Sequence, residues 1–216
     1  MKRPLLLIAA GAFAGPLALL LMIVILGGNL PTTPTPAPPG TGILGGPLAD
    51  TAPVPAAYRP LITQAGSLCP LITPSLLAAQ LHQESNFNPN ARSPAGALGI
   101  AQFLPTSWPS WATDVDGGGA DPFDPADAIT AQGRFMCALA AHFAAAIAIG
   151  AVRDTTVDAA ALAGYNAGQG AVDAAHGIPP YPETEDYVAR ITALLPRYTA
   201  PSAIPARGVP AAPAGP

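Results

Sequence analysis

Glu84 places a carboxyl group at the end of an apolar helix face. The run from Thr73 to Glu84 begins with a capping threonine and a proline, and good helix formers follow. Leu77, Leu81 and Glu84 are spaced i, i+4 and i+7, so they share one face of that helix. Apolar surroundings raise the pKa of a carboxylic acid and let it donate a proton near neutral pH. The alternative is a structural glutamate that accepts backbone N–H bonds.

The segment that follows Glu84 forms a polar turn rich in small residues. Residues 86–89 (NFNP) break the helix, and residues 93–99 (SPAGALG) let two stretches of backbone approach closely. A carboxyl group at a helix end, facing such a turn, suits a bulky polar substrate. The residue types therefore favour a site for acid chemistry on a large molecule.

The elements that position this site are predicted to be helical. Apolar spacing predicts helices over residues 58–68, 73–84, 125–149, 156–163, 170–175 and 183–195, with a short helix after residue 103. The helix over 125–149 carries the widest apolar stripe and is the expected central core helix: Ile129, Phe135, Met136, Leu139, Ala140, Phe143 and Ile147. Because no period-2 alternation occurs over a useful length, we expect an all-α domain.

Composition divides the chain into four parts. Lys2 and Arg3 precede an uncharged apolar run over residues 5–26, long enough to cross a bilayer, so residues 1–28 are predicted to be a membrane anchor with the remainder outside the membrane. The alternative is a signal segment whose cleavage releases a secreted protein. Residues 29–55 have the composition of an extended linker, 56–199 that of a folded domain, and 200–216 that of a disordered tail. The net charge of −4 argues against a nucleic-acid partner.

The chain has two cysteines, Cys69 and Cys137. In an exported domain they most simply form one disulfide, which ties the first helix to the central helix. The alternative is a pair of buried thiols.

Aspartates cluster in the glycine-rich segment before the central helix. Asp114, Asp116 and Asp121 resemble the first half of a calcium loop, but the closing glutamate is missing because position 125 is proline. The alternative is a solvated acidic loop in which Asp124 caps the central helix. No other cofactor is expected.

Three motifs in this chain resemble those of the soluble lytic transglycosylase (SLT) family, relatives of goose-type lysozyme. The first motif consists of Glu84-Ser85, Asn88-Pro89, Ser93, Gly96-Ala97, Gly99 and Gln102. The second is residues 165–168 (YNAG), where Gly164 replaces the alanine usual before the tyrosine, and the third combines Glu183-Thr184 with Tyr187-Val188. They follow the family's order over residues 57–198. The resemblance implies a lysozyme-like helical fold.

The resemblance also implies a reaction. A lytic transglycosylase of peptidoglycan cleaves the MurNAc–GlcNAc β-1,4 bond and leaves a 1,6-anhydro-MurNAc end, with Glu84 as the sole acid and base. Ordinary glycosidases need a second carboxylate, whereas Ser93 and Gln102 stand opposite this one. The substrate-binding residues implied by the family are Ser93, Gln102, Tyr165, Asn166 and Tyr187, with Tyr165 also contacting the acid.

Two other functions fit the same sequence. A goose-type-lysozyme-like hydrolase needs the same acid and a base, for which the acidic loop is the candidate. A non-catalytic wall-binding module needs only the cleft, and Trp108 and Trp111 either line a sugar site or belong to the core. The expected partners are peptidoglycan glycan strands, the membrane and a secretion or conjugation apparatus.

Overall fold

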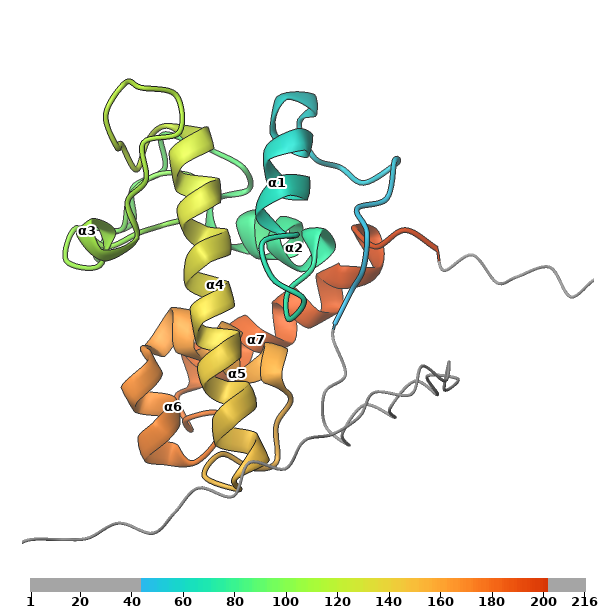
Figure 1. Ribbon diagram of the computed structural model, residues 1–216, viewed down its shortest axis with the longest axis vertical. Helices are drawn as coiled ribbons and strands as arrows, with labels where there is room; N and C mark the ends of the chain where they lie inside the picture. The colour runs from blue at the N-terminus through green and yellow to red at the C-terminus, as the bar shows by residue number, and fades with distance from the viewer. Residues whose placement is uncertain (1–43, 202–216) are drawn as a thin grey trace, which may run out of the picture. The chain divides into compact units, whose positions relative to one another are not determined.

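A long helix, α4 (Pro125–Ala148), runs through the middle of residues 44–201, the part of the chain that this computed structural model describes (Figure 1). Asp124 caps it by accepting the N–H groups of Ala126 and Asp127. Most of the predicted stripe is at most 1% exposed: Ile129, Met136, Leu139, Ala140 and Phe143. Phe135 and Ile147 are only partly buried. The sequence therefore predicts the central helix correctly.

Shorter elements surround α4. They are η1 (Ala56–Tyr58), α1 (Arg59–Ala65), α2 (Pro74–Ser85), α3 (Trp108–Trp111), α5 (Val157–Ala167), α6 (Gln169–Ala175), α7 (Pro182–Leu194) and η2 (Leu195–Arg197). Helices α1, α3 and α5 pack on α4, α2 packs on α1 and α7, and α6 and α7 pack on α5. Within residues 44–201 strand pairing is limited to isolated bridges, so the predicted all-α class is confirmed for the described part.

Helix α2 begins and ends where the sequence predicts. The Thr73 hydroxyl accepts the N–H of Leu76 at 3.2 Å, and Pro74 is the first helical residue. The helix ends after Ser85 because Asn86 and Phe87 both adopt positive φ angles, 51° and 61°. These two residues turn the chain sharply just beyond Glu84.

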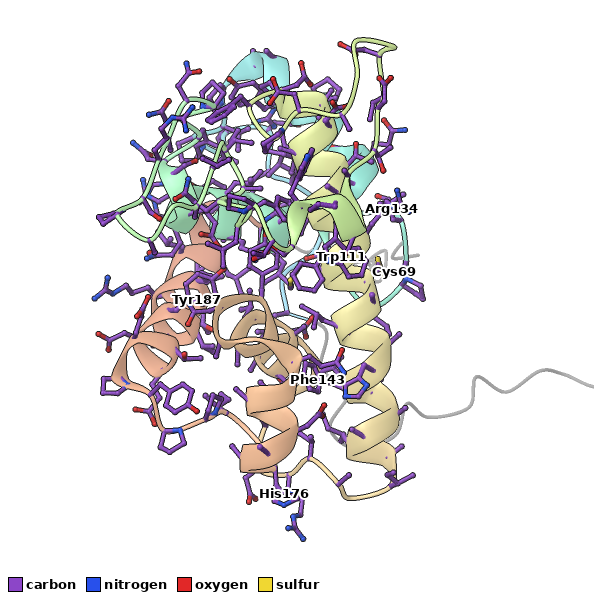
Figure 2. The ribbon with its side chains drawn as sticks, turned by 90° about the vertical axis from the view of Figure 1, so that its left-hand side faces the viewer. Cys69, Trp111, Arg134, Phe143, His176 and Tyr187 are labelled. Carbon is purple, nitrogen blue, oxygen red and sulfur yellow. A yellow bond between two sulfur atoms is a disulfide. The ribbon has the colours of Figure 1, made fainter. Side chains whose placement is uncertain are left out.

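The first predicted helix is shorter than expected. Helix α1 ends at Ala65, and Leu68, predicted on its buried face, is 47% exposed. The chain turns at Gly66, where a Cβ atom would lie 2.4 Å from the Cα of Pro74, so the end of α1 approaches the start of α2 more closely than a side chain allows. Beyond this turn, Cys69 forms a disulfide with Cys137 on α4 (Figure 2).

The domain begins earlier than the predicted boundary at residue 56. Residues 44–55, which we call the N-terminal strap, pack against the domain instead of extending as a linker, and Ala49, Ala52 and Val54 are buried. The N–H of Ala49 donates to the carbonyl of Tyr198, and the Arg59 guanidinium donates to the carbonyls of Ala49 and Ala52. The domain also extends past its predicted C-terminal boundary at residue 199, because the N–H of Ala200 donates to the carbonyl of Pro47. These paired backbone groups are why a proline-rich stretch is held in place.

Helix α5 extends past its predicted end at residue 163 and includes Tyr165 and Asn166. Gly164 has a packing role there. A Cβ atom at this position would lie 2.8 Å from Cε2 of Phe143 and 3.1 Å from Cδ2 of Leu139. The departure from the family's alanine thus lets α5 lie closer to α4.

The predicted anchor, residues 1–28, lies outside the described residues, as do most of the predicted linker and tail. Among the helices between residues 44 and 201, none combines the length and apolar character that a membrane crossing requires.

Candidate active site

Glu84 lies in the last turn of α2, with its carboxyl group surrounded by protein atoms and a small surface open to a cleft. Burial raises its pKa from 4.5 to about 7, while a hydrogen bond from Tyr187 acts in the opposite direction. Desolvation dominates because the charged form loses its water. Glu84 can therefore hold a proton at neutral pH and also release it.

Tyr187 is the direct partner of this acid. It lies on α7 (Figure 2), is 7% exposed, and its hydroxyl donates to Oε1 of Glu84 at 2.5 Å. The same hydroxyl accepts a hydrogen bond from Nε2 of Gln80 at 3.0 Å. Burial and the adjacent Glu84 raise the pKa of Tyr187 well above its ordinary value, so its proton stays in place. Two hydrogen bonds in series thus run from Gln80 through Tyr187 to Glu84.

The turn after α2 is tied back to the site by two hydroxyl groups. Ser85 Oγ donates to the carbonyl of Ile100 at 2.7 Å, and the hydroxyl of Tyr165 donates to the carbonyl of Ala101 at 2.8 Å. Gly99 has a φ of 74°, and a Cβ atom there would lie 1.7 Å from the carbonyl oxygen of Pro122. The small residues predicted to allow close approach do so at this position.

Ser93 and Gln102 are held within this turn. Ser93 Oγ accepts the N–H of Ala97 at 3.0 Å, and Nε2 of Gln102 donates to the carbonyl of Gly99 at 2.8 Å. Each retains hydrogen-bonding capacity, because a hydroxyl also donates and an amide oxygen accepts. Both can therefore bind a polar ligand without moving.

Two clefts with lining residues in common lie at the site, and Glu84 lines one of them. One, of about 250 Å³, is lined by Glu84, Ser93, Ala95, Ala97, Gln102, Leu104, Tyr165, Asn166 and Glu183. The other, of about 300 Å³, is lined by Gln83, Asn166, Glu183, Asp186, Tyr187 and Arg190. Asn166 and Glu183 line both, so the clefts are neighbours along the start of α7. All five predicted substrate-binding residues line one or the other.

Both tyrosines line a cleft as predicted, but the one that hydrogen-bonds to Glu84 is Tyr187 and not Tyr165. Tyr165, expected to contact the acid, hydrogen-bonds to Ala101 and lines the cleft, whereas Tyr187 hydrogen-bonds to the acid. Burial, and secondly the charge of Glu84, raises the pKa of Tyr165, so it lies near the acid without bonding to it. Asn166 is oriented by Thr184, whose hydroxyl donates to its side-chain oxygen at 2.8 Å.

The tryptophans pack in an aromatic cluster. Trp111 stacks on Phe135 at 4.5 Å between ring centroids, beside α4 (Figure 2). Trp108 meets Phe103 edge to face at 5.2 Å, and the Phe103 and Tyr165 ring centroids are 5.9 Å apart. Neither tryptophan lines the two clefts, so the core alternative describes both.

The acidic loop brings together a different set of carboxylates from the predicted one. Asp114, Asp116 and Asp127 each have an oxygen within 4.8 Å of the others, whereas Asp121 accepts the N–H of Phe123. Asp127 is completely buried, and its two oxygens accept the N–H groups of Val115 and Asp121. Asp114 and Asp116 accept loop N–H groups as well. These carboxylates order their own loop, and calcium stays a prediction.

The sequence patterns do not predict the place of two residues in the site, Gln80 and Glu183. From the sequence, Gln80 is interpreted only as a helix former. A polar residue one turn before Glu84 on an apolar helix is nevertheless a local indication that its side chain has a role at the site. Glu183 lies in the first turn of α7, where an acid interacts favourably with the helix dipole, and its exposed side chain also lines both clefts. Nothing in the local pattern shows this, because the cleft forms between elements distant in sequence.

Known proteins similar to this chain include a domain family and two solved structures. Residues 63–187 match the transglycosylase SLT domain family, which is more than half of the 216-residue chain. The 70-kDa soluble lytic transglycosylase of Escherichia coli is similar, with 26% identity over 63% of this chain and a TM-score of 0.47. A complex of the 70-kDa soluble lytic transglycosylase with bulgecin A gives 27% identity, 63% coverage and a TM-score of 0.48. This chain spans only 23% of the length of either structure. The family match over residues 63–187 shows that the chain belongs to the transglycosylase SLT domain family.

Proposed function

We propose that this protein is a peptidoglycan lytic transglycosylase, which cleaves the MurNAc–GlcNAc β-1,4 bond and leaves 1,6-anhydro-MurNAc ends. The observation that carries the proposal is Glu84, a cleft-lining carboxyl group with a pKa of about 7 and a tyrosine donor on one oxygen. Such a group suits a reaction in which one carboxyl first gives and then takes a proton, because both forms are accessible near neutral pH. Membership of the SLT family supports the same activity.

The first step is cleavage. Glu84 gives its proton to the glycosidic oxygen as the bond from that oxygen to C1 of MurNAc breaks, and the 2-acetamido oxygen forms a bond to C1. The Tyr187 hydroxyl donates to the carboxylate produced and stabilises its charge. The GlcNAc part of the strand leaves with the new hydroxyl group.

The second step closes the anhydro ring. The Glu84 carboxylate takes the proton of the C6 hydroxyl, whose oxygen bonds to C1 as the acetamido oxygen departs. The acid is thereby regenerated, and no water enters the reaction. Ser93, Gln102 and Asn166 hold the sugar through their remaining donors and acceptors, and Tyr165 and Leu104 supply apolar lining.

A hydrolase is the second candidate, and Glu183 is the specific observation in its favour. Its exposed side chain lines the same cleft as Glu84, which supplies the second carboxylate that an ordinary glycosidase needs. The acidic loop is a weaker source of the base, because its carboxylates are engaged with their own backbone.

Product analysis separates the two reactions. The protein is incubated with purified peptidoglycan, and the released fragments are measured by mass spectrometry, because anhydro and reducing ends differ by one water. We expect anhydro ends, no release by Glu84→Gln, and anhydro ends at a lower rate from Glu183→Gln. Reducing ends that disappear in Glu183→Gln would establish the hydrolase, and wild-type activity in Glu84→Gln would exclude Glu84 as the acid. If the wild type binds peptidoglycan and releases nothing, the protein is a wall-binding module.

The setting of this activity is also a proposal. The apolar run at residues 5–26, after Lys2 and Arg3, supports a membrane-tethered enzyme that acts outside the cytoplasmic membrane. Fractionation of cells that express the full chain tests this, and a protein found only in the medium would indicate cleavage and secretion. An association with a secretion or conjugation apparatus fits a tethered wall-cleaving enzyme.

A further inference from the structure

The side-chain amide of Gln80 is one of the few polar side-chain groups buried in the described part of this domain. Gln80 is completely buried on α2, one helical turn before Glu84, among neighbours on the same helix that are also fully buried. Its Nε2 donates to the hydroxyl of Tyr187, while its Oε1 has no hydrogen-bond partner among the described residues. An apolar side chain of similar size would fill the space without leaving an acceptor unpaired. What distinguishes Gln80 from Gln132, which is also completely buried, is its hydrogen bond to the partner of Glu84.

We infer that Gln80 is a positioning residue that acts through Tyr187 to fix which oxygen of Glu84 carries the catalytic proton. The inference rests on the proposed acid role of Glu84. The Tyr187 oxygen accepts from Gln80, so its own proton points to Oε1 of Glu84. Oε1 is then always an acceptor. The proton of the acid form belongs to Oε2, the oxygen free to face the substrate.

Without Gln80, the direction of the hydrogen bond between Tyr187 and Glu84 is no longer determined. A hydroxyl group both donates and accepts, so Tyr187 could turn and accept a proton from Glu84. Part of the acid would then hold its proton on Oε1, in the bond to Tyr187, where it cannot reach the glycosidic oxygen. Donation from Gln80 also polarises the hydroxyl and strengthens its bond to the carboxylate.

The groups around Glu84 limit what else could act on its proton. The titratable side chains that face it are Tyr187 from α7, Tyr165 from α5 and Glu183, which shares the cleft. His82, on α2 itself, is hydrogen-bonded to Tyr198. Gln80 carries no charge, so it acts on Glu84 only through hydrogen bonding.

The first test measures the pKa of Glu84 directly. The chain has three glutamates, Glu84, Glu183 and Glu185, so a protein labelled with ¹³C at the glutamate carboxyl gives three signals, and Glu84→Gln identifies one of them. In Gln80→Met the weaker Tyr187 bond favours the carboxylate less, and the pKa of Glu84 rises by about 0.5 to 1. If Gln80 instead accepts a hydrogen bond from Tyr187 in the wild type, the hydrogen bonds from Gln80 to Glu84 run in the opposite direction. The pKa of Glu84 then falls in Gln80→Met. A fall, or no change, overturns the inference.

The matched control is Gln132→Met. Gln132 is also completely buried, and neither of its side-chain amide atoms has a hydrogen-bond partner among the described residues. The substitution is therefore the same in size and burial but breaks no bond to Tyr187. We expect the pKa of Glu84 to stay unchanged in this variant. Gln80→Leu serves as a second version of the test variant if Gln80→Met folds poorly.

The second test uses kinetics. Gln80→Met lowers kcat about fivefold with KM unchanged, as expected for loss of one hydrogen bond in the transition state. In the Tyr187→Phe background the same change has no further effect on kcat, because the residue through which Gln80 acts is gone. Equal effects in both backgrounds would mean that Gln80 acts independently of Tyr187. If the wild type releases no fragments but Gln80→Met raises the pKa of Glu84, the proposed function fails and the positioning role stands.

Discussion

The chemistry of Glu84 follows from two opposing effects on one carboxyl group. Burial favours the neutral form, and the hydrogen bond from Tyr187 favours the charged form, and their balance places the pKa at about 7. An acid that must donate a proton and then accept one is best served by such a balance. For the proposed reaction, activity falls as the pH rises through about 7, because the acid form is lost.

The raised pKa also predicts how stability depends on pH. The pKa of Glu84 is about 7 in the folded chain and near 4.5 when unfolded, so the folded state keeps a proton between these values that the unfolded state has lost. Stability therefore decreases as the pH rises from 4.5 to 7. Glu84→Gln removes this cost, and we expect it to raise the free energy of unfolding by about 1 to 3 kcal/mol at pH 8. The gain vanishes at pH 4.

Denaturant unfolding of both proteins at pH 4 and pH 8 measures the effect. Glu183→Gln is the control, because its exposed side chain is not buried on folding. A Glu84→Gln variant with the same advantage at both pH values would show that the gain comes from packing and not from the proton.

The N-terminal strap joins elements that are far apart in sequence. The N–H of Leu44 donates to Oδ2 of Asp158 on α5, the N–H of Gly46 donates to Ser75 at the start of α2, and Ala49 bonds to Tyr198 after η2. Burial raises the pKa of Asp158 to about 6, and the Leu44 N–H opposes that rise. The strap therefore pairs polar groups that would otherwise be buried alone.

Removing the strap is expected to destabilise the domain. Compared with residues 44–201, a protein of residues 56–201 loses the buried side chains of Ala49, Ala52 and Val54, and Asp158 loses the hydrogen bond from the N–H of Leu44. The expected loss in the free energy of unfolding is about 2 to 4 kcal/mol. Thermal unfolding of the two proteins measures it. Equal midpoints would mean that the domain does begin at residue 56, as the composition suggests.

At the scale of the whole described part, the disulfide connects the segment between α1 and α2 to the central helix. Cys69 lies between α1 and α2, and Cys137 lies on α4, so the bridge adds a covalent link to the packing of α1 on α4. The bridged residues are 68 positions apart, and closing so long a loop reduces the entropy of the unfolded chain.

Loss of the disulfide is predicted to lower stability but leave the reaction unchanged. Replacing both cysteines with alanine should reduce the free energy of unfolding by about 2 to 4 kcal/mol. Because neither cysteine lines the two clefts, kcat at a temperature well below the melting point should stay close to the wild-type value. Adding reductant should lower the melting temperature of the wild type and have no effect on the variant. If reductant leaves the melting temperature of the wild type unchanged, the protein does not contain this disulfide.

Much of this protein can be predicted from the sequence because the relevant signals are local. Helix α2 depends on a threonine cap, a proline and a leucine stripe, all within a few turns of Glu84. The central helix depends on its own apolar period, which local spacing encodes directly. The same holds for Gly99 and the turn around it, where small residues signal close approach of the backbone.

The tertiary structure alone decided which groups meet across the site. Tyr165 and Tyr187 each belong to one of the family's motifs. Only the packing of the helices decides that Tyr187 hydrogen-bonds to Glu84 and Tyr165 to Ala101. The same packing brings Gln80 to Tyr187, 107 positions apart, and places Glu183 in the cleft. A side chain's face on its own helix is set by 3.6-residue periodicity, but its partner on another helix depends on how the two helices cross. The sequence therefore determined the proposed acid and its helix, and the packing of distant helices determined which groups contact it.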